Sequence, residues 1–251
     1  MIFDIHAHFG ETKFGDKDIT AETILSIMDA SGIDKAILLP TISTGRVLPA
    51  RRMKEEVQKA PDRLVGFALV NPKDPHAVTD FEEAVVRYDA RGLKIHPVFM
   101  ALAADDEFWV YPLIEKAQEL GVPVMFHSGE APYATPWQIG LVAQDFPKAT
   151  IIMEHMGFDA MCFTDAAIKM AKRAENLILG TTGVMYDFPI TKAVNTIGSD
   201  RVVFGSEMPI NNPCHEIQKI RDAKIGDDDK EKILGLNILR ILKMDSPDQR
   251  G

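Results

Sequence analysis

The sequence predicts an α/β fold, a single (β/α)8 TIM barrel with one extra C-terminal helix, over residues 1–251. Short apolar or β-branched runs alternate with amphipathic segments along the whole chain, a pattern typical of right-handed βαβ crossovers and a parallel sheet. Eight such runs occur, which is the number of strands that closes a parallel barrel. No linker rich in Gly, Pro or Ser divides the chain, so we expect one domain.

The expected strands are short runs of mainly apolar residues. They cover residues 2–6, 35–40, 64–70, 92–96, 122–127, 150–155, 177–182 and 202–207. The main alternative is an open doubly wound sheet, which usually has fewer strands and a Gly-rich phosphate-binding turn after the first strand. Only a lone Gly10 stands at that place, and the barrel is therefore favoured.

Amphipathic segments between these strands have the apolar spacing of helices. In the first, Ile24, Ile27 and Met28 share one side, with Thr20 as the expected N-cap and Gly32 as the expected stop. The expected helices cover residues 20–30, 49–60, 78–88, 110–120, 137–146, 165–174, 190–197 and 213–223. Residues 229–242 remain as the extra C-terminal helix, expected to pack across the outside or one end of the barrel.

Composition narrows the class of protein. A hydrophobic content of 46% with 26% charged residues is ordinary for a globular domain in water. The net charge of −9 argues against nucleic acid and against an anionic membrane as partners. The two cysteines, Cys162 and Cys214, form no CxxC pattern. With no signal-peptide pattern or apolar span in the sequence, we expect a cytoplasmic protein.

The first expected strand contains the pattern Asp4-x-His6-x-His8. Side chains two apart in a strand point the same way, so His6 and His8 are expected to project together. Two neutral imidazoles that close suit one divalent metal ion. The alternative is a pair of polar residues at a frayed terminal strand, with Asp4 hydrogen-bonded to one of them.

Histidines gather where the expected strands end. Of the seven in the chain, five lie at or just past C-terminal strand ends: His6, His8, His96, His127 and His155. Glu207 has the same position on the eighth strand. The C-terminal ends of barrel strands share one face, where active sites lie, so we expect these side chains to converge. His76 and His215 are expected to be surface or capping residues.

Six short motifs resemble the amidohydrolase superfamily, specifically its amidohydrolase-related (amidohydrolase 2) branch, which includes aminocarboxymuconate-semialdehyde decarboxylase-like proteins. They occur in the family's order across nearly the whole chain, and together they are specific although most are weak singly. The motifs are Asp4-x-His6-x-His8, Gly92-Leu93-Lys94-Ile95-His96-Pro97, Phe126-His127-Ser128-Gly129, Glu154-His155-Met156-Gly157, Phe204-Gly205-Ser206-Glu207-Met208-Pro209 and Asn237-Ile238-Leu239-Arg240-Ile241-Leu242.

The resemblance implies roles for individual residues. His6, His8 and His127 match the family's ligands for one divalent metal ion, expected to be Zn²⁺, with Mn²⁺ or Fe²⁺ as alternatives. His155 matches the histidine beside the metal-bound water, an acid–base group or charge stabiliser. Glu207 stands where the family usually has Asp, so it is expected to be a metal ligand or a catalytic base. The alternative for Glu207 is a structural carboxylate paired with Lys or Arg.

The expected reaction is hydrolysis of a small organic amide, ester or lactone by a metal-activated water, with His155 and Glu207 handling protons. One alternative is metal-dependent non-oxidative decarboxylation of an unsaturated or aromatic acid. Because such decarboxylases tend to be longer, the compact chain favours the hydrolase. A different alternative is a catalytically degenerate barrel that binds a metabolite, suggested by the change from Asp to Glu207.

Further residues are expected to contact a small-molecule substrate. Lys94 and His96 share one face of the fourth strand. Some superfamily members carboxylate a lysine there to bridge two metals, but a buried Lys94 paired with Asp4 or Glu207 is the simpler expectation. His96 either lines the pocket or caps the strand.

Specificity is expected to come from the loops that follow the strands. Arg46 has the chemistry to bind a substrate carboxylate with two hydrogen bonds, although a solvated loop arginine is the commoner case. Tyr186 lies in the loop over residues 183–189, where an aromatic ring serves either substrate contact or lid packing. Related barrels often form dimers, which makes a homodimer one expected assembly.

Overall fold

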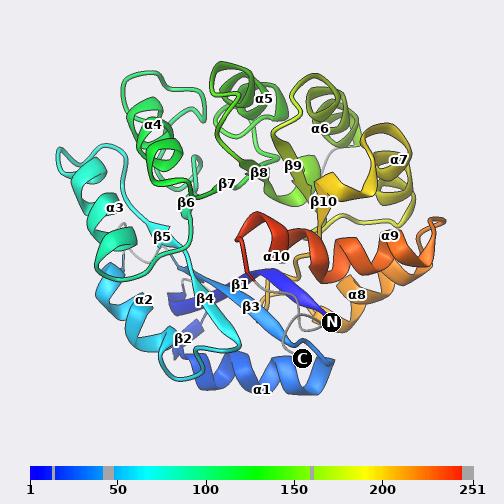
Figure 1. Ribbon diagram of the computed structural model, residues 1–251, viewed down its shortest axis with the longest axis horizontal. Coiled ribbons are helices and arrows are strands. Elements are labelled where there is room, and N and C mark those ends of the chain that lie inside the picture. The colour runs from blue at the N-terminus through cyan, green and yellow to red at the C-terminus, as the bar shows by residue number, and fades with distance from the viewer. Residues whose placement is uncertain (13–14, 42–47, 159–160, 245–251) are drawn as a thin grey trace.

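The computed structural model describes residues 1–12, 15–41, 48–158 and 161–244. Strands lie at the centre and helices surround them (Figure 1). In chain order the strands are β1 (Phe3–Thr12), β2 (Gly15–Ile19), β3 (Lys35–Pro40), β4 (Leu64–Gly66), β5 (Ala68–Leu69), β6 (Leu93–Ile95), β7 (Val124–Phe126), β8 (Ile151–Met153), β9 (Leu177–Gly180) and β10 (Val202–Val203). Apart from β2, they correspond to the eight predicted strands.

Two runs of parallel strands make up the barrel. One has the order β1-β3-β4 and the other β5-β6-β7-β8-β9-β10. The third predicted strand is split at Phe67, whose N–H donates to the Leu38 carbonyl at 3.1 Å. First and last strands meet where the Ile5 N–H donates to the Phe204 carbonyl at 3.0 Å. The predicted barrel is therefore confirmed.

A short hairpin at the end of β1 was not predicted. β2 pairs antiparallel with β1, with Gly10 opposite Ile19. Residues 9–19 are rich in Gly, Asp, Glu and Lys and lack the apolar alternation that marks a strand. The hairpin extends β1 beyond the barrel. It does so on the face formed by the C-terminal ends of the strands, which is where parallel barrels have their active sites.

Helices follow the strands as predicted, with end points shifted by a few residues. They are α1 (Ala21–Ser31), α2 (Ala50–Val57), α3 (Ala77–Val86), α4 (Tyr111–Leu120), α5 (Pro136–Asp145), α6 (Met161–Arg173), α7 (Phe188–Ile197) and α8 (Pro213–Asp222). Gly32 ends α1 in the left-handed conformation at φ 71°, as expected. Thr20 occupies the N-cap position but makes no side-chain hydrogen bond there. Instead the Glu56 carboxylate accepts from the Ala21 N–H at 2.7 Å.

The extra C-terminal helix closes one end of the barrel. It consists of α9 (Asp227–Glu231), a π-helical turn (Lys232–Leu236) and α10 (Asn237–Ile241). Buried side chains from α10 and just beyond it join the apolar cluster inside the barrel. That interior cluster comprises Phe3, Ile5, Ile37, Leu39, Val65, Phe67, Met125, Ile152, Ile178, Val203, Ile238, Leu239 and Leu242. The helix thus seals the end opposite the predicted active site.

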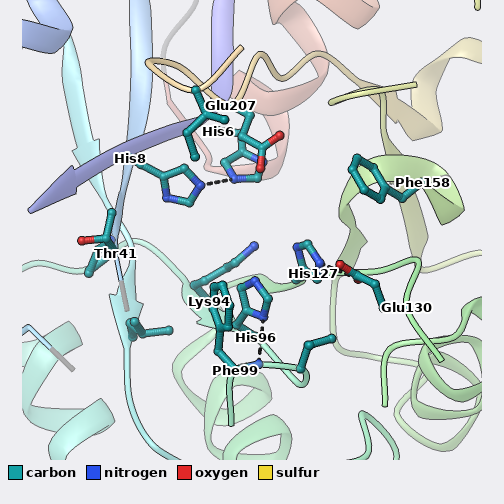
Figure 2. A pocket seen from close by; sticks show the side chains of 14 residues that line it. His6, His8, Thr41, Lys94, His96, Phe99, His127, Glu130, Phe158 and Glu207 are labelled. Atoms are coloured by element: carbon teal, nitrogen blue, oxygen red, sulfur yellow. Dashed lines mark hydrogen bonds and ion pairs between the residues drawn. The ribbon is translucent and has the colours of Figure 1, made fainter. Parts of the chain in front are cut away.

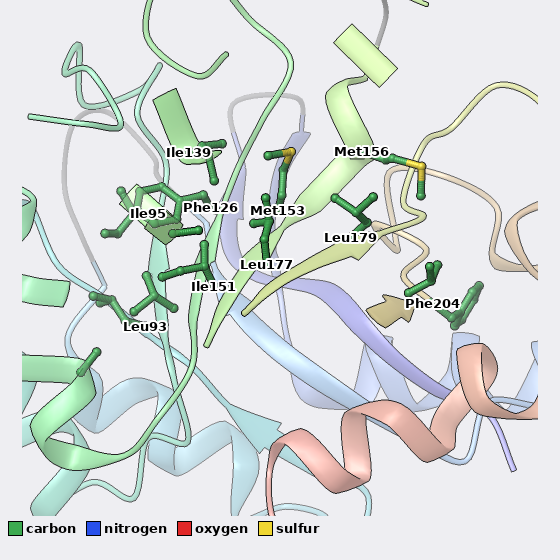
Figure 3. Close-up of a cluster of buried hydrophobic side chains, with 14 of the residues drawn as sticks. Leu93, Ile95, Phe126, Ile139, Ile151, Met153, Met156, Leu177, Leu179 and Phe204 are labelled. Carbon is green, nitrogen blue, oxygen red and sulfur yellow. The ribbon is translucent and has the colours of Figure 1, made fainter. Parts of the chain in front are cut away.

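A larger apolar cluster lies between the strands and the surrounding helices. Figure 3 shows part of it, where Leu93, Ile95 and Phe126 meet Ile139 of α5. Both faces of the parallel strands are therefore buried, which explains why they appear in sequence as continuous apolar runs. Among the helices of the described ranges, none combines the length and apolarity that a bilayer span requires.

Glu56 offers a test of this outer packing. Its side chain is 3% exposed and pairs with Arg52 at 3.0 Å and Lys59 at 2.8 Å, besides accepting from Ala21. We expect Glu56→Ala to lower the free energy of unfolding by about 2 kcal/mol, because two half-exposed cations and one backbone N–H lose their partner. Urea denaturation measures this change. An unchanged midpoint would show that solvent replaces all three interactions.

Candidate metal centre

A cavity of about 350 Å³ lies at the C-terminal ends of the barrel strands. Polar and apolar side chains contribute to its wall in similar number, and they come from segments far apart in sequence (Figure 2). They are His6, His8, Pro40, Thr41, Leu69, Lys94, His96, Val98, Phe99, His127, Glu130, Phe158, Glu207 and Ile210. The convergence expected from strand polarity is thus present.

A β-bulge in β1 turns His6 and His8 into this cavity. The register with β3 shifts between Asp4 and Ala7, where one strand has an extra residue. Ile5 and His6 both lie within this stretch: Ile5 belongs to the interior cluster, and His6 lines the cavity. Strict alternation would send these neighbours to opposite faces. The bulge therefore lets the barrel interior hold both an apolar floor and the histidine pair.

His6, His8 and Glu207 form a compact cluster of potential metal ligands. One ligand atom from each lies within 4.8 Å of the other two. The Nε2 atoms of His6 and His8 are 2.9 Å apart. Burial keeps the pKa of His6 well below its usual value and lowers that of His8 to about 3. Both rings are therefore neutral, which is the form that binds metals.

An unpaired polar atom beside this cluster also fits a divalent ion. Nε2 of His155 is buried and has no hydrogen-bond partner among the described residues. Buried polar atoms in proteins are normally paired, so such a group needs an explanation. Two imidazoles and one carboxylate are a donor set that zinc, manganese and iron ions accept. The residues present thus fit a bound cation.

Glu207 follows β10 with its backbone in the left-handed region, at φ 64°. Its Oε2 accepts from the Asn211 amide at 3.1 Å. Burial raises the pKa of Glu207 to about 7, and Lys94 partly opposes that increase. Within the described part of the chain, no Lys or Arg forms an ion pair with it at 4.0 Å or less. The position is the one expected of a ligand or a base.

Gly205 allows the segment that follows β10, the last strand of the barrel, to approach β1 closely. A Cβ atom at this position would lie 2.2 Å from Thr182 Oγ1 and 2.9 Å from Ile5 Cγ1. It would also lie 3.2 Å from the His6 Cβ. Because only glycine leaves this space free, Gly205 keeps Glu207 and His6 on adjacent strands within reach of each other.

His127 lies in the cavity but outside the compact cluster. Its Nε2 is 2.6 Å from Glu130 Oε2, and its ring stacks on His96 with centroids 3.9 Å apart. Phe99 covers the other side of His96 at 4.0 Å, so three flat rings form one wall of the cavity. Metal ligation by His127 stays a prediction, and it would require the ring or Glu130 to rearrange.

Lys94 pairs with a carboxylate other than the two expected. Its Nζ contacts Glu154 Oε2, and both side chains are buried. Burial acts to lower the pKa of Lys94 well below its usual value, whereas contact with the Glu154 carboxylate favours the ammonium form. Asp4 is instead satisfied by the Ser206 N–H at 2.9 Å, the Ser206 hydroxyl and the His6 N–H at 2.8 Å. Because Asp4 precedes the bulge, it faces Ser206 rather than Lys94. Carboxylation would make the Lys94 side chain negative and place it against the Glu154 carboxylate. The observed ion pair therefore argues against a carboxylated Lys94 that bridges two metal ions.

Glu154 is the residue of this centre that the sequence analysis did not single out. It directly follows β8, and it lies 3.3 Å from Nδ1 of His6 and 3.9 Å from Nε2 of His155. The sequence does contain a feature that could have identified it: Glu154 is a charged residue at the end of an apolar strand, directly before His155. His155 itself is fully buried, with Nδ1 3.2 Å from the Thr182 carbonyl, and it lies behind the cavity wall.

The two loop residues predicted to bind substrate remain without structural support. Tyr186 is 52% exposed and stacks on Phe188, and it is not part of the cavity wall described above. Arg46 lies outside the described residues. His96 and Lys94 both line the cavity, and substrate binding by them stays a prediction.

Comparison with known proteins assigns the chain to a family and agrees with the fold. The model of the Amidohydrolase family matches residues 3–244, and the chain therefore belongs to this family, in its amidohydrolase 2 branch. Gamma-resorcylate decarboxylase of Rhizobium sp. (strain MTP-10005) is 26% identical over 290 residues, covering 89% of this chain and 87% of that protein.

Solved structures show the same barrel. An uncharacterised TIM-barrel protein of Bordetella bronchiseptica superposes with a TM-score of 0.81 at 20% identity, covering 96% of this chain and 98% of that one. A dihydroxybenzoic acid decarboxylase of Polaromonas sp. JS666, with bound manganese and the inhibitor 2-nitroresorcinol, has a TM-score of 0.76 at 20% identity. The coverage in that case is 99% of this chain and 98% of the other.

Proposed function

We propose that this protein is a metal-dependent non-oxidative decarboxylase of a small aromatic acid. The observation that carries the proposal is the cluster of His6, His8 and Glu207 in a cavity that also contains the buried ammonium group of Lys94. Similarity to a gamma-resorcylate decarboxylase supports this reaction. The alternative of the sequence analysis is thus favoured over hydrolysis, since chain length alone was the reason for ranking hydrolysis first.

His6, His8 and Glu207 would hold one divalent ion, with His127 as a further candidate. Manganese in the Polaromonas structure supports Mn²⁺, whereas the sequence led us to expect Zn²⁺. Bound here, a divalent ion would supply a Lewis acid for the anionic oxygens of a substrate. The two neutral histidines leave the positive charge of that ion available to the substrate.

Lys94 and the ring wall would bind the rest of an aromatic acid. The Lys94 ammonium reaches into the cavity between His6 and His127 (Figure 2), where it can contact a carboxylate or phenolate oxygen. His96, held between Phe99 and His127, offers a flat surface for an aromatic ring. The apolar side chains of the wall limit water around the bound ring.

Decarboxylation replaces the carboxylate by hydrogen and releases carbon dioxide, so the ring carbon must receive one proton. Glu130 lines the cavity, where burial raises its pKa and Lys94 opposes that increase. With Glu207 bound to metal, Glu130 is the proposed proton donor. His155 donates through Nδ1 to the Thr182 carbonyl, so its Nε2 is an acceptor and suits a base or orienting role.

Hydrolysis of a small amide, ester or lactone is the second candidate. The acceptor nitrogen of His155, buried behind the cluster and without a partner among the described residues, is what favours it. Such an atom can orient a water molecule for attack on a carbonyl. In either reaction the metal ligands would be the same, namely His6 and His8 of β1 and Glu207 after β10.

The deciding experiment measures carbon dioxide release and hydrolysis side by side. Protein loaded with Mn²⁺ or Zn²⁺ is incubated with hydroxybenzoic acids, including 2,6-dihydroxybenzoate, and separately with lactones, esters and anilides. We expect carbon dioxide release that stops when a chelator removes the metal. Hydrolysis without decarboxylation would overturn the proposal in favour of the second candidate. Metal binding with neither activity across the panel would indicate the binding barrel considered from the sequence.

A further inference from the structure

Glu154 lies between two parts of the site that the proposed function treats separately. Its Oε2 contacts the ammonium of Lys94, and its Oε1 is 3.3 Å from Nδ1 of His6. The carboxylate is fully buried, so solvent does not compete for either oxygen. The main-chain carbonyl of Glu154 also accepts from the Ser128 hydroxyl, which holds this turn against the loop after β7.

We propose that Glu154 is a positioning residue of the metal centre, which keeps the proton of His6 on Nδ1 and thereby directs the Nε2 lone pair toward His8 and Glu207. Its second oxygen holds the Lys94 ammonium in the cavity. This inference rests on the proposed metal centre.

A neutral imidazole carries a single ring proton, on either Nδ1 or Nε2. A carboxylate accepts but does not donate, so the nitrogen of His6 that faces Glu154 is the one that carries the proton. Nδ1 of His6 and Oε1 of Glu154 lie 3.3 Å apart, both are buried, and neither has a hydrogen bond to any other of the residues described. Nε2, which lies 2.9 Å from Nε2 of His8, is then left as a lone pair.

An outer carboxylate has a known physical effect on a metal-binding histidine. It fixes the tautomer and ring orientation and makes the ligating nitrogen more basic, and its loss typically costs about 10- to 100-fold in metal affinity. Among the described carboxylates, Glu154 has the required position relative to His6. Glu207 lies on the opposite side of the ring, where the ligand atoms converge.

A second metal ion among His6, Glu154 and His155 is the competing interpretation. Their ligand atoms also lie within 4.8 Å of one another. However, the Lys94 ammonium already contacts the same carboxylate, and a divalent ion there would face that positive charge at close range. The Lys94–Glu154 pair therefore favours the positioning role over a second metal site.

The test separates the two contacts of Glu154. In Lys94→Met/Glu154→Leu, both members of the buried pair are replaced by apolar groups, which leaves no unpaired charge and is a change that buried ion pairs often tolerate. Affinities for Mn²⁺ and Zn²⁺ are measured by competition with a chelator. The tautomer of His6 is read from the ¹⁵N chemical shifts of its ring in the metal-free protein, with assignment by His6→Gln.

We expect the double variant to bind both metals about 10- to 100-fold more weakly than the original protein. We expect metal-free original protein to carry the His6 proton on Nδ1 and the double variant to show a mixture of tautomers. Glu154→Gln keeps an amide oxygen that can accept from Nδ1–H, so it should retain most of the metal affinity while raising KM for an acidic substrate through the disturbed Lys94. The matched control is Glu56→Gln, another buried carboxylate with cationic partners, which should leave metal affinity unchanged.

Wild-type metal affinity together with an Nδ1–H tautomer in the double variant would overturn the inference and leave Glu154 as a counter-ion of Lys94 only. An Nε2–H tautomer in the metal-free original protein would overturn it as well. The ¹⁵N measurement needs neither metal nor substrate. If the protein binds no metal at all, the proposed function fails while the hydrogen bond between Glu154 and His6 is still decided.

Discussion

Replacing both His6 and His8 by alanine is expected to abolish binding of a divalent metal and to lower decarboxylation by about a thousandfold or more. The two Nε2 atoms lie 2.9 Å apart, and together with Glu207 they supply the ligand atoms that converge. A catalytic metal contributes several kcal/mol to transition-state stabilisation. Each 1.36 kcal/mol corresponds to about a factor of ten in rate, which gives the expected loss.

Elemental analysis of protein purified without a histidine tag gives the metal content, and carbon dioxide release gives the activity. His96→Ala is the matched control, because His96 also lines the cavity but lies outside the ligand cluster. It should keep its metal and lose activity only through weaker substrate binding. A double alanine variant that still holds one equivalent of metal would show that the ion binds elsewhere, and the proposed centre would be wrong.

The barrel was predictable because its pattern is local. Parallel strands buried on both faces appear as short apolar runs, and the C-terminal end of each is a position that can be counted along the chain. Strand order alone therefore assigned His6, His127 and Glu207 to one face of the molecule. The hairpin of β2 was not predictable in this way, because it forms from polar residues whose pairing depends on where β1 continues beyond the barrel.

Contacts between side chains of different strands were harder to predict from the sequence. The partner of Lys94 depends on the register between β6 and β8 and on the bulge in β1, and no local pattern in the sequence encodes these. Asp4 was one of the two expected partners of Lys94, but it precedes the bulge and contacts Ser206 instead. Glu154 was overlooked for the same reason, since a strand-end carboxylate reveals nothing about its neighbours until the strands are placed.

Glu207 should control how metal binding depends on pH. Burial raises its pKa to about 7, and a metal binds only its ionised form. Below pH 7 a proton therefore competes with the metal, and affinity should fall by up to about tenfold for each pH unit, while above about pH 8 it should be constant. His8, with a pKa of about 3, does not contribute in this range because it is already neutral.

Three variants distinguish the roles open to Glu207. Glu207→Gln should weaken metal binding about tenfold or more at pH 8 and remove the dependence on pH, because an amide is a weaker ligand and has no proton to lose. Glu207→Asp should keep both metal binding and its pH dependence, because the carboxylate remains although its side chain is one methylene shorter. Glu216→Gln is the control, since burial also raises the pKa of Glu216, yet this carboxylate binds the Gly183 N–H and Lys219 instead of lining the cavity. The charge of Glu216 also raises the pKa of Glu207, so this variant should move the pH dependence to lower pH while the slope persists. If the slope persists unchanged in Glu207→Gln, another carboxyl group such as Glu130 titrates with the metal, and Glu207 is not a ligand.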